Sequence, residues 1–486
     1  MKRREFLQFS GALAAQSLLA SGLLQTLFIQ NSLGQAVSVK SLQDALSPQD
    51  GLVLVPESSD FQKYQWAYNR RTMLTPLVRV LCKTPKAVSE SLNWAQANDV
   101  PLAMRCGGHS YEGFSQSQGL VIDLRLMNQI EVSQDRQLVQ VGGGGLLGQV
   151  YESLAPHKLV IPAGTCPTVG ISGHTTGGGY GLSARNFGLA CDSLMEAEYV
   201  DAGGTIRTAS STQDFDFLWA SRGGGGGSFG VITKLTYKTH SLANVIAFGM
   251  EWTVNVSVAV SIMQAWLQWA PNLPNTITSL LSVTKNQDGS INLKCKGQSA
   301  GSMAELDSAL KKMQTVKKAE NVRTKAMTFI DGAHYFAGGA EGEPKFRKVK
   351  CDYIKNSISD DGLKTLLTEY PAGKVSVTLD SYGGTINDKT SADGAFAHRK
   401  GTLCSLKYSS NWDKAADNNA RIALIRKFHD SMKPFVSGSS YINYCDTDIK
   451  DFGTAYWGDN FARLQQIKKA LDPRNVFQHA QSIPVK

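Results

Sequence analysis

The stretch VPLAMRCGGHSYEG, residues 100–113, reads as a β-strand that runs directly into a glycine turn. Upstream, PLVRVLCKT (76–84) is strand-like, and KAVSESLNWAQAND (86–99) has apolar residues at helical spacing after Thr84-Pro85, a typical helix start. GLVIDL (119–124) supplies a further strand. This order predicts a β-α-β unit around the motif. Because Gly107 and Gly108 have no side chains, we expect another group to approach the backbone closely at this turn.

Further glycine loops follow along the chain. LVQVGGGGLLGQVYESLA (138–155) reads as strand, glycine loop and helix, and MEAEYVDAGGTIRTAS (195–210) reads as a hairpin with its turn at 201–204. DFDFLWASRGGGGGSFGVITKLTYKT (214–239) predicts a short helix, a glycine loop and a strand. The loops at 107–108, 142–145, 177–179 and 223–227 offer backbone N–H groups to a pyrophosphate or a carbonyl-rich ring. A single large, flat, anionic cofactor would use all four loops, and a flavin dinucleotide fits that description.

A nicotinamide cofactor is the alternative. GGGYGLSARNFG (177–188) superficially matches a dinucleotide fingerprint. It does not follow a clear strand, and no acidic residue stands at a convincing ribose position. The sequence therefore favours the flavin.

The second half of the chain has a different pattern of predicted helices and strands. With 486 residues, the chain exceeds what one hydrophobic core usually holds, so we expect at least two domains. From about Asn244, helical segments (258–271 and 303–315) alternate with strand-like ones (279–286, 291–298, 374–384 and 404–412). An amphipathic helix at about 460–471 ends at Asp472-Pro473. This pattern predicts an antiparallel sheet covered by helices, and an α+β fold for the whole chain.

Charge and cysteine content exclude some classes of protein. The net charge is +9, but Lys and Arg are scattered and do not alternate with aromatic residues, so we expect no nucleic-acid partner. A basic chain also suits an anionic cofactor. The eight cysteines form no CxxC pair, so we expect no metal site. An exported chain could form disulfides, but the sequence gives no pairing.

The N-terminus resembles a twin-arginine export signal, with Arg3-Arg4 before Glu5-Phe6-Leu7 and a modest apolar run. A membrane anchor is the alternative, but polar residues interrupt the run from Gly11 to Ile29, which would span lipid poorly. We therefore expect cleavage near 34–36, no stable membrane insertion, the twin-arginine machinery as a transient partner, and a periplasmic or extracellular location.

Several long motifs in order resemble the berberine-bridge-enzyme-like group of FAD-linked oxidases, in the vanillyl-alcohol-oxidase superfamily with its PCMH-type FAD-binding domain. The motifs are RCGGHSYEG (105–113), PAGTCPTVGISGHTTGGGYGLSARNFGLACD (162–192), WASRGGGGGSFGVIT (219–233), YGG (382–384) with AHRKG (397–401), YINYCDTD (441–448) and YWGDNFARLQQIKKALDPRNVFQHAQSIP (456–484). The resemblance covers nearly the whole chain after the signal, and its motifs come closest to those of bacterial and fungal oligosaccharide oxidases. It implies a signal at 1–36, a two-part FAD-binding domain at 37–243, a substrate domain with an antiparallel sheet at 244–440, and a C-terminal segment at 441–486 that returns to the FAD domain.

The resemblance implies a doubly attached FAD, held by His109 at the flavin 8α-methyl group and by Cys166 at C6. His174 would stabilise the reduced flavin near its C2 carbonyl, and Val169 would leave O2 a path to the flavin. The other cofactor-binding residues that it implies are Arg105, Gly107, Gly108, Ser110, Gly170, Gly173, Gly178, Gly179, Gly230, Val231, Tyr441 and Asn443.

On the substrate side, the resemblance makes Tyr444, the second Tyr of YINY, the base that removes a hydroxyl proton. Lys407 would lower the pKa of Tyr444, Asp380 matches the acidic partner of oligosaccharide oxidases, and Tyr111 would face the same cavity.

Three functions follow from these residues. The first is a sugar or oligosaccharide oxidase that takes hydride from C1 and yields a lactone and H2O2. The second is a tailoring oxidase of a secondary metabolite with an aromatic, glycosylated or alkaloid-like substrate. The third is an exported binding protein with a vestigial flavin fold, against which the presence of His109, Cys166 and Tyr444 argues.

Overall fold

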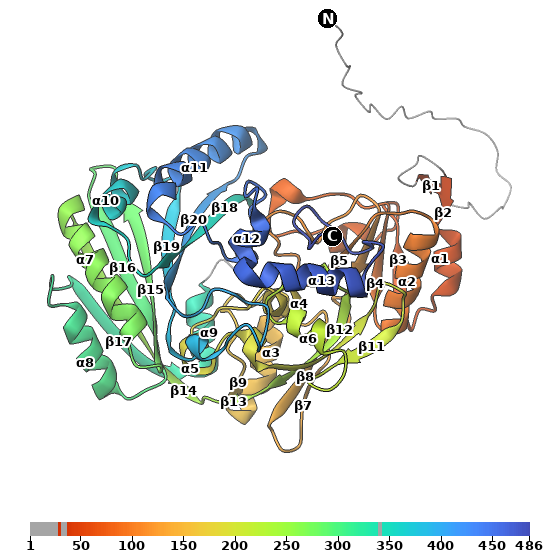
Figure 1. The fold of residues 1–486 in the computed structure, drawn as a ribbon, viewed down its shortest axis with the longest axis horizontal. Helices are drawn as coiled ribbons and strands as arrows, with labels where there is room; N and C mark the ends of the chain where they lie inside the picture. Colours follow the sequence, from red (N-terminus) through yellow and green to blue (C-terminus); the bar gives the residue numbers. More distant parts are fainter. Residues whose placement is uncertain (1–27, 31–35, 339–342) are drawn as a thin grey trace, which may run out of the picture.

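Three large sheets organise the computed structural model, which describes residues 28–30, 36–338 and 343–486 (Figure 1). The first has four strands in the order β3 (Gly51–Leu54), β4 (Val78–Cys82), β6 (Leu120–Asp123) and β5 (Leu102–Arg105). Strands β4, β6 and β5 are parallel, and helix α2 (Pro85–Ala97) connects β4 to β5. The Thr84 hydroxyl caps this helix by accepting from the Ala87 N–H. The predicted β-α-β unit is therefore confirmed.

The second sheet is antiparallel, with five strands in the order β11 (Ile206–Ala209), β10 (Leu194–Val200), β12 (Val231–Lys238), β8 (Leu138–Gly142) and β7 (Ile130–Val132). Strands β10 and β11 form the predicted hairpin. Helices α3 (Leu147–Leu154), α6 (Phe215–Ser221) and α13 (Phe461–Leu471) contribute to the same hydrophobic cluster as this sheet. Since α13 comes from the end of the chain, the C-terminal segment packs against elements from the first half.

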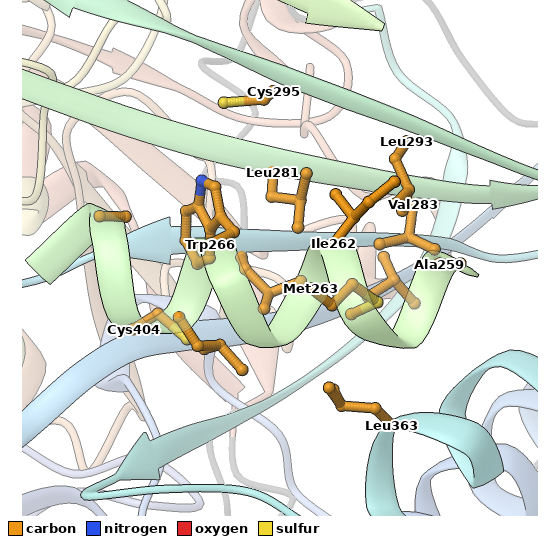
Figure 2. Packing of buried hydrophobic residues seen from close by; sticks show 14 of the residues in the cluster. Ala259, Ile262, Met263, Trp266, Leu281, Val283, Leu293, Cys295, Leu363 and Cys404 are labelled. Atoms are coloured by element: carbon orange, nitrogen blue, oxygen red, sulfur yellow. The ribbon is translucent and has the colours of Figure 1, made fainter. Parts of the chain in front are cut away.

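The third sheet carries seven antiparallel strands in the order β17 (Asn321–Thr328), β14 (Asn244–Val254), β16 (Ile291–Ser299), β15 (Ile277–Lys285), β19 (Ser376–Ser381), β20 (Thr402–Trp412) and β18 (Phe346–Lys355). Its apolar face packs against α7 (Val256–Trp269), α8 (Met303–Met313), α10 (Asp360–Thr368) and α11 (Asn418–Met432). Figure 2 shows this core, where Trp266 and Met263 of α7 lie against Leu281 and Val283 of β15. Alternation along each strand sends the remaining side chains to the opposite face. The predicted α+β class is confirmed.

Smaller elements complete the fold. They are β1 (Phe28–Gln30), β2 (Ala36–Ser38), α1 (Lys40–Ala45), β9 (Leu159–Val160), α4 (Ile171–Thr176), α5 (Ala184–Phe187), β13 (His240–Ser241), α9 (Phe329–Ala337) and α12 (Phe452–Trp457). All eight cysteines are free thiols in this structure. Within the described ranges, no helix is long and apolar enough to cross a bilayer. The predicted export signal falls almost entirely outside the described residues.

Candidate active site

A cavity of about 330 Å³ lies where the two smaller sheets meet the C-terminal segment. Most of its lining comes from 104–115, 166–176, 217–232 and 441–445. Tyr68, which precedes these segments, and His479, which follows them, also line it. The residues predicted from the sequence that line it are Arg105, Gly107, Gly108, His109, Ser110, Tyr111, Cys166, Val169, Gly170, Gly173, His174, Gly230, Val231, Tyr441, Asn443 and Tyr444. The fold therefore gathers residues from distant motifs around one space.

The turn at 107–108 is tight because protein backbone approaches it. A Cβ on Gly107 would lie 2.4 Å from the Gly170 nitrogen. Gly108 has a φ of +72°, in the left-handed region that favours glycine, and a Cβ there would meet the Arg105 guanidinium. The close approach expected from the sequence is thus present, and the group that approaches Gly107 is the loop around Gly170.

His109 and Cys166 both lie next to one hydroxyl group. The Thr168 Oγ1 is 3.0 Å from the His109 Nε2 and 3.6 Å from the Cys166 Sγ. The His109 ring stacks on Tyr68, with 4.3 Å between ring centroids. Burial lowers the pKa of His109 to about 3, so the imidazole is neutral at physiological pH. With Nε2 held by Thr168, Nδ1 is the ring nitrogen left available as a nucleophile.

His174 is held from two sides. Its Nε2 accepts the Gly164 N–H at 2.9 Å, and its backbone oxygen accepts the Asn443 side-chain amide at 2.9 Å. Burial lowers the pKa of His174 to about 4. Because Nε2 is an acceptor, the ring proton lies on Nδ1. The Tyr441 hydroxyl in turn accepts the Gly179 N–H at 3.0 Å and the Tyr180 N–H at 3.1 Å. Tyr441 and Asn443 therefore fix the loop that carries His174.

Tyr444 joins the cavity to the seven-stranded sheet. Its hydroxyl donates to the Asp380 Oδ2 of β19 at 3.5 Å, and the Lys407 ammonium of β20 lies 4.8 Å from the centroid of its ring. The Tyr111 ring meets the Tyr444 ring edge-on, with 6.1 Å between centroids. These four side chains, which are the predicted catalytic set, come together at one end of the cavity, although Asp380 and Lys407 stand behind Tyr444 and do not line it.

The pKa of Tyr444 is raised in this structure, whereas a lowered pKa was expected from the sequence. Burial raises it well above 10, and the adjacent Asp380 carboxylate raises it further. Burial also raises the pKa of Asp380, whereas the charge of Lys407 lowers it. The pKa of Tyr444 is therefore raised on balance, mainly by burial, and the lowering by Lys407 stays a prediction.

Comparisons with known proteins establish the family. An "FAD binding domain" model matches residues 76–210, and a "Berberine and berberine like" model matches residues 440–484. An uncharacterized FAD-linked oxidoreductase, YgaK of Bacillus subtilis, is 31% identical over 442 residues, which covers 89% of this chain and 97% of that protein. The chain belongs to the berberine-bridge-enzyme-like family of FAD-linked oxidoreductases.

Solved structures of this family have the same fold. BBE-like 1 of Physcomitrella patens superposes with a TM-score of 0.84 at 28% identity, covering 92% of this chain and 99% of that one. A variant of Phl p 4 described as a glucose oxidase superposes with a TM-score of 0.83 at 26% identity, covering 92% and 99%.

The cavity suits the FAD of this family. Arg105 is buried in its wall, and its Nη1 has no hydrogen-bond partner among the described residues. Behind it, Arg79 and Arg125 bind the buried Asp123 at 2.7 and 2.8 Å, so three guanidinium groups face one carboxylate. This excess positive charge beside an open cavity suits an anionic group such as a pyrophosphate. The residues present therefore fit the cofactor.

Two of the predicted glycine loops do not line the cavity. The N–H groups of Gly178 and Gly179 are taken by the Thr175 oxygen and the Tyr441 hydroxyl. In the loop at 142–145, a Cβ on Gly143 would lie 2.2 Å from the Ile232 oxygen. These glycines permit close packing between elements, whereas the lining glycines of the other two loops are 107, 108 and 225–227. The expectation that one cofactor uses all four loops is thus wrong.

Two other lining residues, Tyr68 and His479, were not among the residues predicted from the sequence. Tyr68 sits between strands and far from any glycine motif, yet it stacks on His109. His479 stacks on Phe114, with 4.2 Å between centroids, and its Nε2 lies 3.2 Å from the Gly226 oxygen. His479 lies in the motif at 456–484, but no role was predicted for it there, and the fold is what places it in the cavity.

Proposed function

We propose that this protein oxidises the alcohol carbon of a saccharide, at C1 to give a lactone, and transfers the electrons to O2. The observation that carries the proposal is the contact of the Tyr444 hydroxyl with the Asp380 carboxylate at 3.5 Å, at the end of an FAD-type cavity. An alcohol needs a group that removes its hydroxyl proton while hydride leaves the carbon. Tyr444 lines the cavity and has a proton acceptor directly behind it.

The raised pKa values indicate how the two side chains work together. Tyr444 is neutral at physiological pH, so by itself it is a poor base. It accepts the substrate proton as its own proton passes to the Asp380 carboxylate, and the basicity of the site is then that of Asp380. Asp380 must be ionised for this relay. Lys407 favours the ionised form of Asp380, and its position over the Tyr444 ring also suits transient phenolate character.

FAD, when bound, accepts the hydride and passes two electrons to O2, giving H2O2. The chain would hold it covalently through the His109 Nδ1 and the Cys166 Sγ, and the hydroxyl of Thr168 orients both side chains. Arg105 would balance the pyrophosphate charge, and His174, with its proton on Nδ1, can donate a hydrogen bond toward the cavity. Val169 lines the same wall with a small side chain and leaves room for O2.

Three arguments favour a saccharide as the substrate. The sheet face next to Tyr444 carries polar residues such as Ser282, Thr378 and Ser405, which suit a hydroxylated ligand. A variant of Phl p 4, which has the same fold, is described as a glucose oxidase. Export through the twin-arginine route, proposed from Arg3-Arg4, would expose the enzyme to extracellular saccharides.

A peroxide-release screen tests the proposal. Purified enzyme is given mono- and oligosaccharides in one set and aromatic or alkaloid-like alcohols in the other, and H2O2 is measured with a coupled peroxidase. We expect turnover with members of the saccharide set. Turnover confined to the aromatic set would replace the proposal with a tailoring oxidase.

A further inference from the structure

The polar face of the seven-stranded sheet, opposite the core of Figure 2, carries positive charge beside Asp380. Directly opposed residues in antiparallel strands share a face. The register pairs Lys296 of β16 with Leu280 of β15, and Leu280 with Asp380 of β19. Lys296 and Asp380 therefore lie in one row, two strands and about 10 Å apart.

Lys296 stands without a partner. Its side chain is exposed, and within the described parts of the chain it makes no ion pair or hydrogen bond. Lys294, two residues earlier on the same face, pairs with Glu251 at 3.6 Å. The contrast shows that the sheet neutralises one lysine and leaves the other free.

Space is open next to this charge. Gly249 of β14 is the neighbour of Lys296 on the side away from Asp380, and a Cβ there would meet only the Cys295 oxygen at 4.0 Å. The row that starts at the reacting end with Asp380 thus reaches a free ammonium group beside an uncovered strip of sheet. It continues through Gly249 to Arg323 of β17, whose Nε donates to the Asn321 side chain at 3.2 Å.

We propose that Lys296 forms a subsite for an anionic group of the substrate, so that the enzyme prefers a carboxylate-bearing saccharide, such as one with a uronic acid unit, over its neutral counterpart. This rests on the proposed function. The alcohol lies at Tyr444 and Asp380 while the carboxylate, on the neighbouring part of the ligand, pairs with the Lys296 ammonium. A charge-assisted pair of this kind both binds and sets the orientation of the ligand.

The alternative role for Lys296 is to balance the charge of Asp380. The two roles predict different kinetics. A balancing charge acts through Asp380 and affects neutral and acidic substrates equally, whereas a subsite affects only the acidic ones.

The test compares cellobiose with cellobiouronic acid, which share a reducing glucose, using H2O2 release by the holoenzyme. We expect a kcat/KM about tenfold higher for the acidic disaccharide, in the range of a hydrogen bond to a charged group. NaCl at 0.5 M should reduce this preference because it screens exposed charges. Lys296→Met should remove the preference through a raised KM and leave cellobiose within twofold of wild type. Lys312→Met, on the distant helix α8, removes the same charge and should change neither.

Other outcomes separate the two proposals. Equal oxidation of both sugars with no effect of Lys296→Met overturns the subsite and leaves the saccharide oxidase intact. An equal loss on both sugars in Lys296→Met also overturns it, in favour of charge balance. If neither sugar is oxidised, binding of glucuronate is measured by isothermal titration calorimetry. Binding by wild type but not by Lys296→Met would keep the anion subsite although the saccharide oxidase proposal fails. Absence of binding to wild type would overturn both proposals.

Discussion

The two walls of the active site are built in opposite ways. The wall from residues 105–110 and 164–176 consists of turns and the short helix α4, packed so closely that several positions admit only glycine. The wall from the seven-stranded sheet is regular, and its chemistry lies in side chains such as Asp380 and Lys407 that project from strands. The first wall depends on backbone shape and the second on replaceable side chains. This difference suits an enzyme that keeps one cofactor and adapts to many substrates.

The largest difference between the two walls is expected for a pair of glycine substitutions, one on each wall. Gly107→Ala places a Cβ 2.4 Å from the Gly170 nitrogen, so we expect a loss of more than about 3 kcal/mol in the free energy of unfolding and no bound flavin. Gly249→Ala, on the sheet wall, meets only an oxygen at 4.0 Å and should stay within about 1 kcal/mol of wild type. Thermal unfolding and flavin absorbance measure both. Similar stability of the two variants would contradict the distinction between the walls.

Removal of the two proposed attachment residues should abolish covalent flavin. His109 and Cys166 both lie next to Thr168 and line the cavity, and in the proposed function each forms its own bond to FAD. We expect His109→Ala and Cys166→Ala each to keep one FAD per chain in mass spectra of denatured protein, and the double variant to keep none. Free chain mass in denatured wild type would rule out attachment at either residue.

A smaller effect is expected from Lys407→Met on the sheet wall. The Lys407 charge lowers the pKa of Asp380, so its removal raises that pKa. Asp380 must be ionised to accept a proton, so flavin reduction is present above this pKa and is lost as the pH falls through it. The acidic limb of the anaerobic reduction rate should therefore move to higher pH. An unmoved limb would show that Lys407 does not act on Asp380.

Val169→Leu should have the smallest effect. The longer side chain fills the space beside the cofactor, so reoxidation of the reduced enzyme by O2 should slow several-fold while reduction by substrate is unchanged. Stopped-flow traces in air-saturated buffer give both rates. Equal reoxidation rates would remove Val169 from the path of O2.

The sequence predicted the regular parts of the fold better than the site. Thr84-Pro85 starts α2 as expected, and the hairpin of β10 and β11 forms where its glycine turn predicted, because these signals are local. The sequence could not predict which glycine loops line the cavity. A loop that binds a ligand and a loop that packs against Ile232 have the same composition.

The electrostatics of the site also lay beyond the sequence. Lys407 and Tyr444 are 37 positions apart, and the sequence suggested only that a cation near the phenol would lower its pKa. The fold buries Tyr444 and places Asp380 at its hydroxyl, so the pKa of Tyr444 is raised on balance although Lys407 lies over its ring. The direction of such a pKa shift depends on burial and on which charged group lies at the hydroxyl, and tertiary packing sets both.

The most direct test of the account is the anaerobic rate of flavin reduction in Tyr444→Phe, measured with the best substrate of the peroxide screen. The change removes one hydroxyl and little volume, and Tyr382→Phe, whose buried hydroxyl pairs with Tyr353 at 3.0 Å, is the matched control. We predict a fall of about 10²–10⁴-fold for Tyr444→Phe, as for loss of a positioned general base, with flavin attachment intact and the control near wild type. Reduction of Tyr444→Phe at the wild-type rate would contradict the role of Tyr444 and move the base to another residue of the cavity.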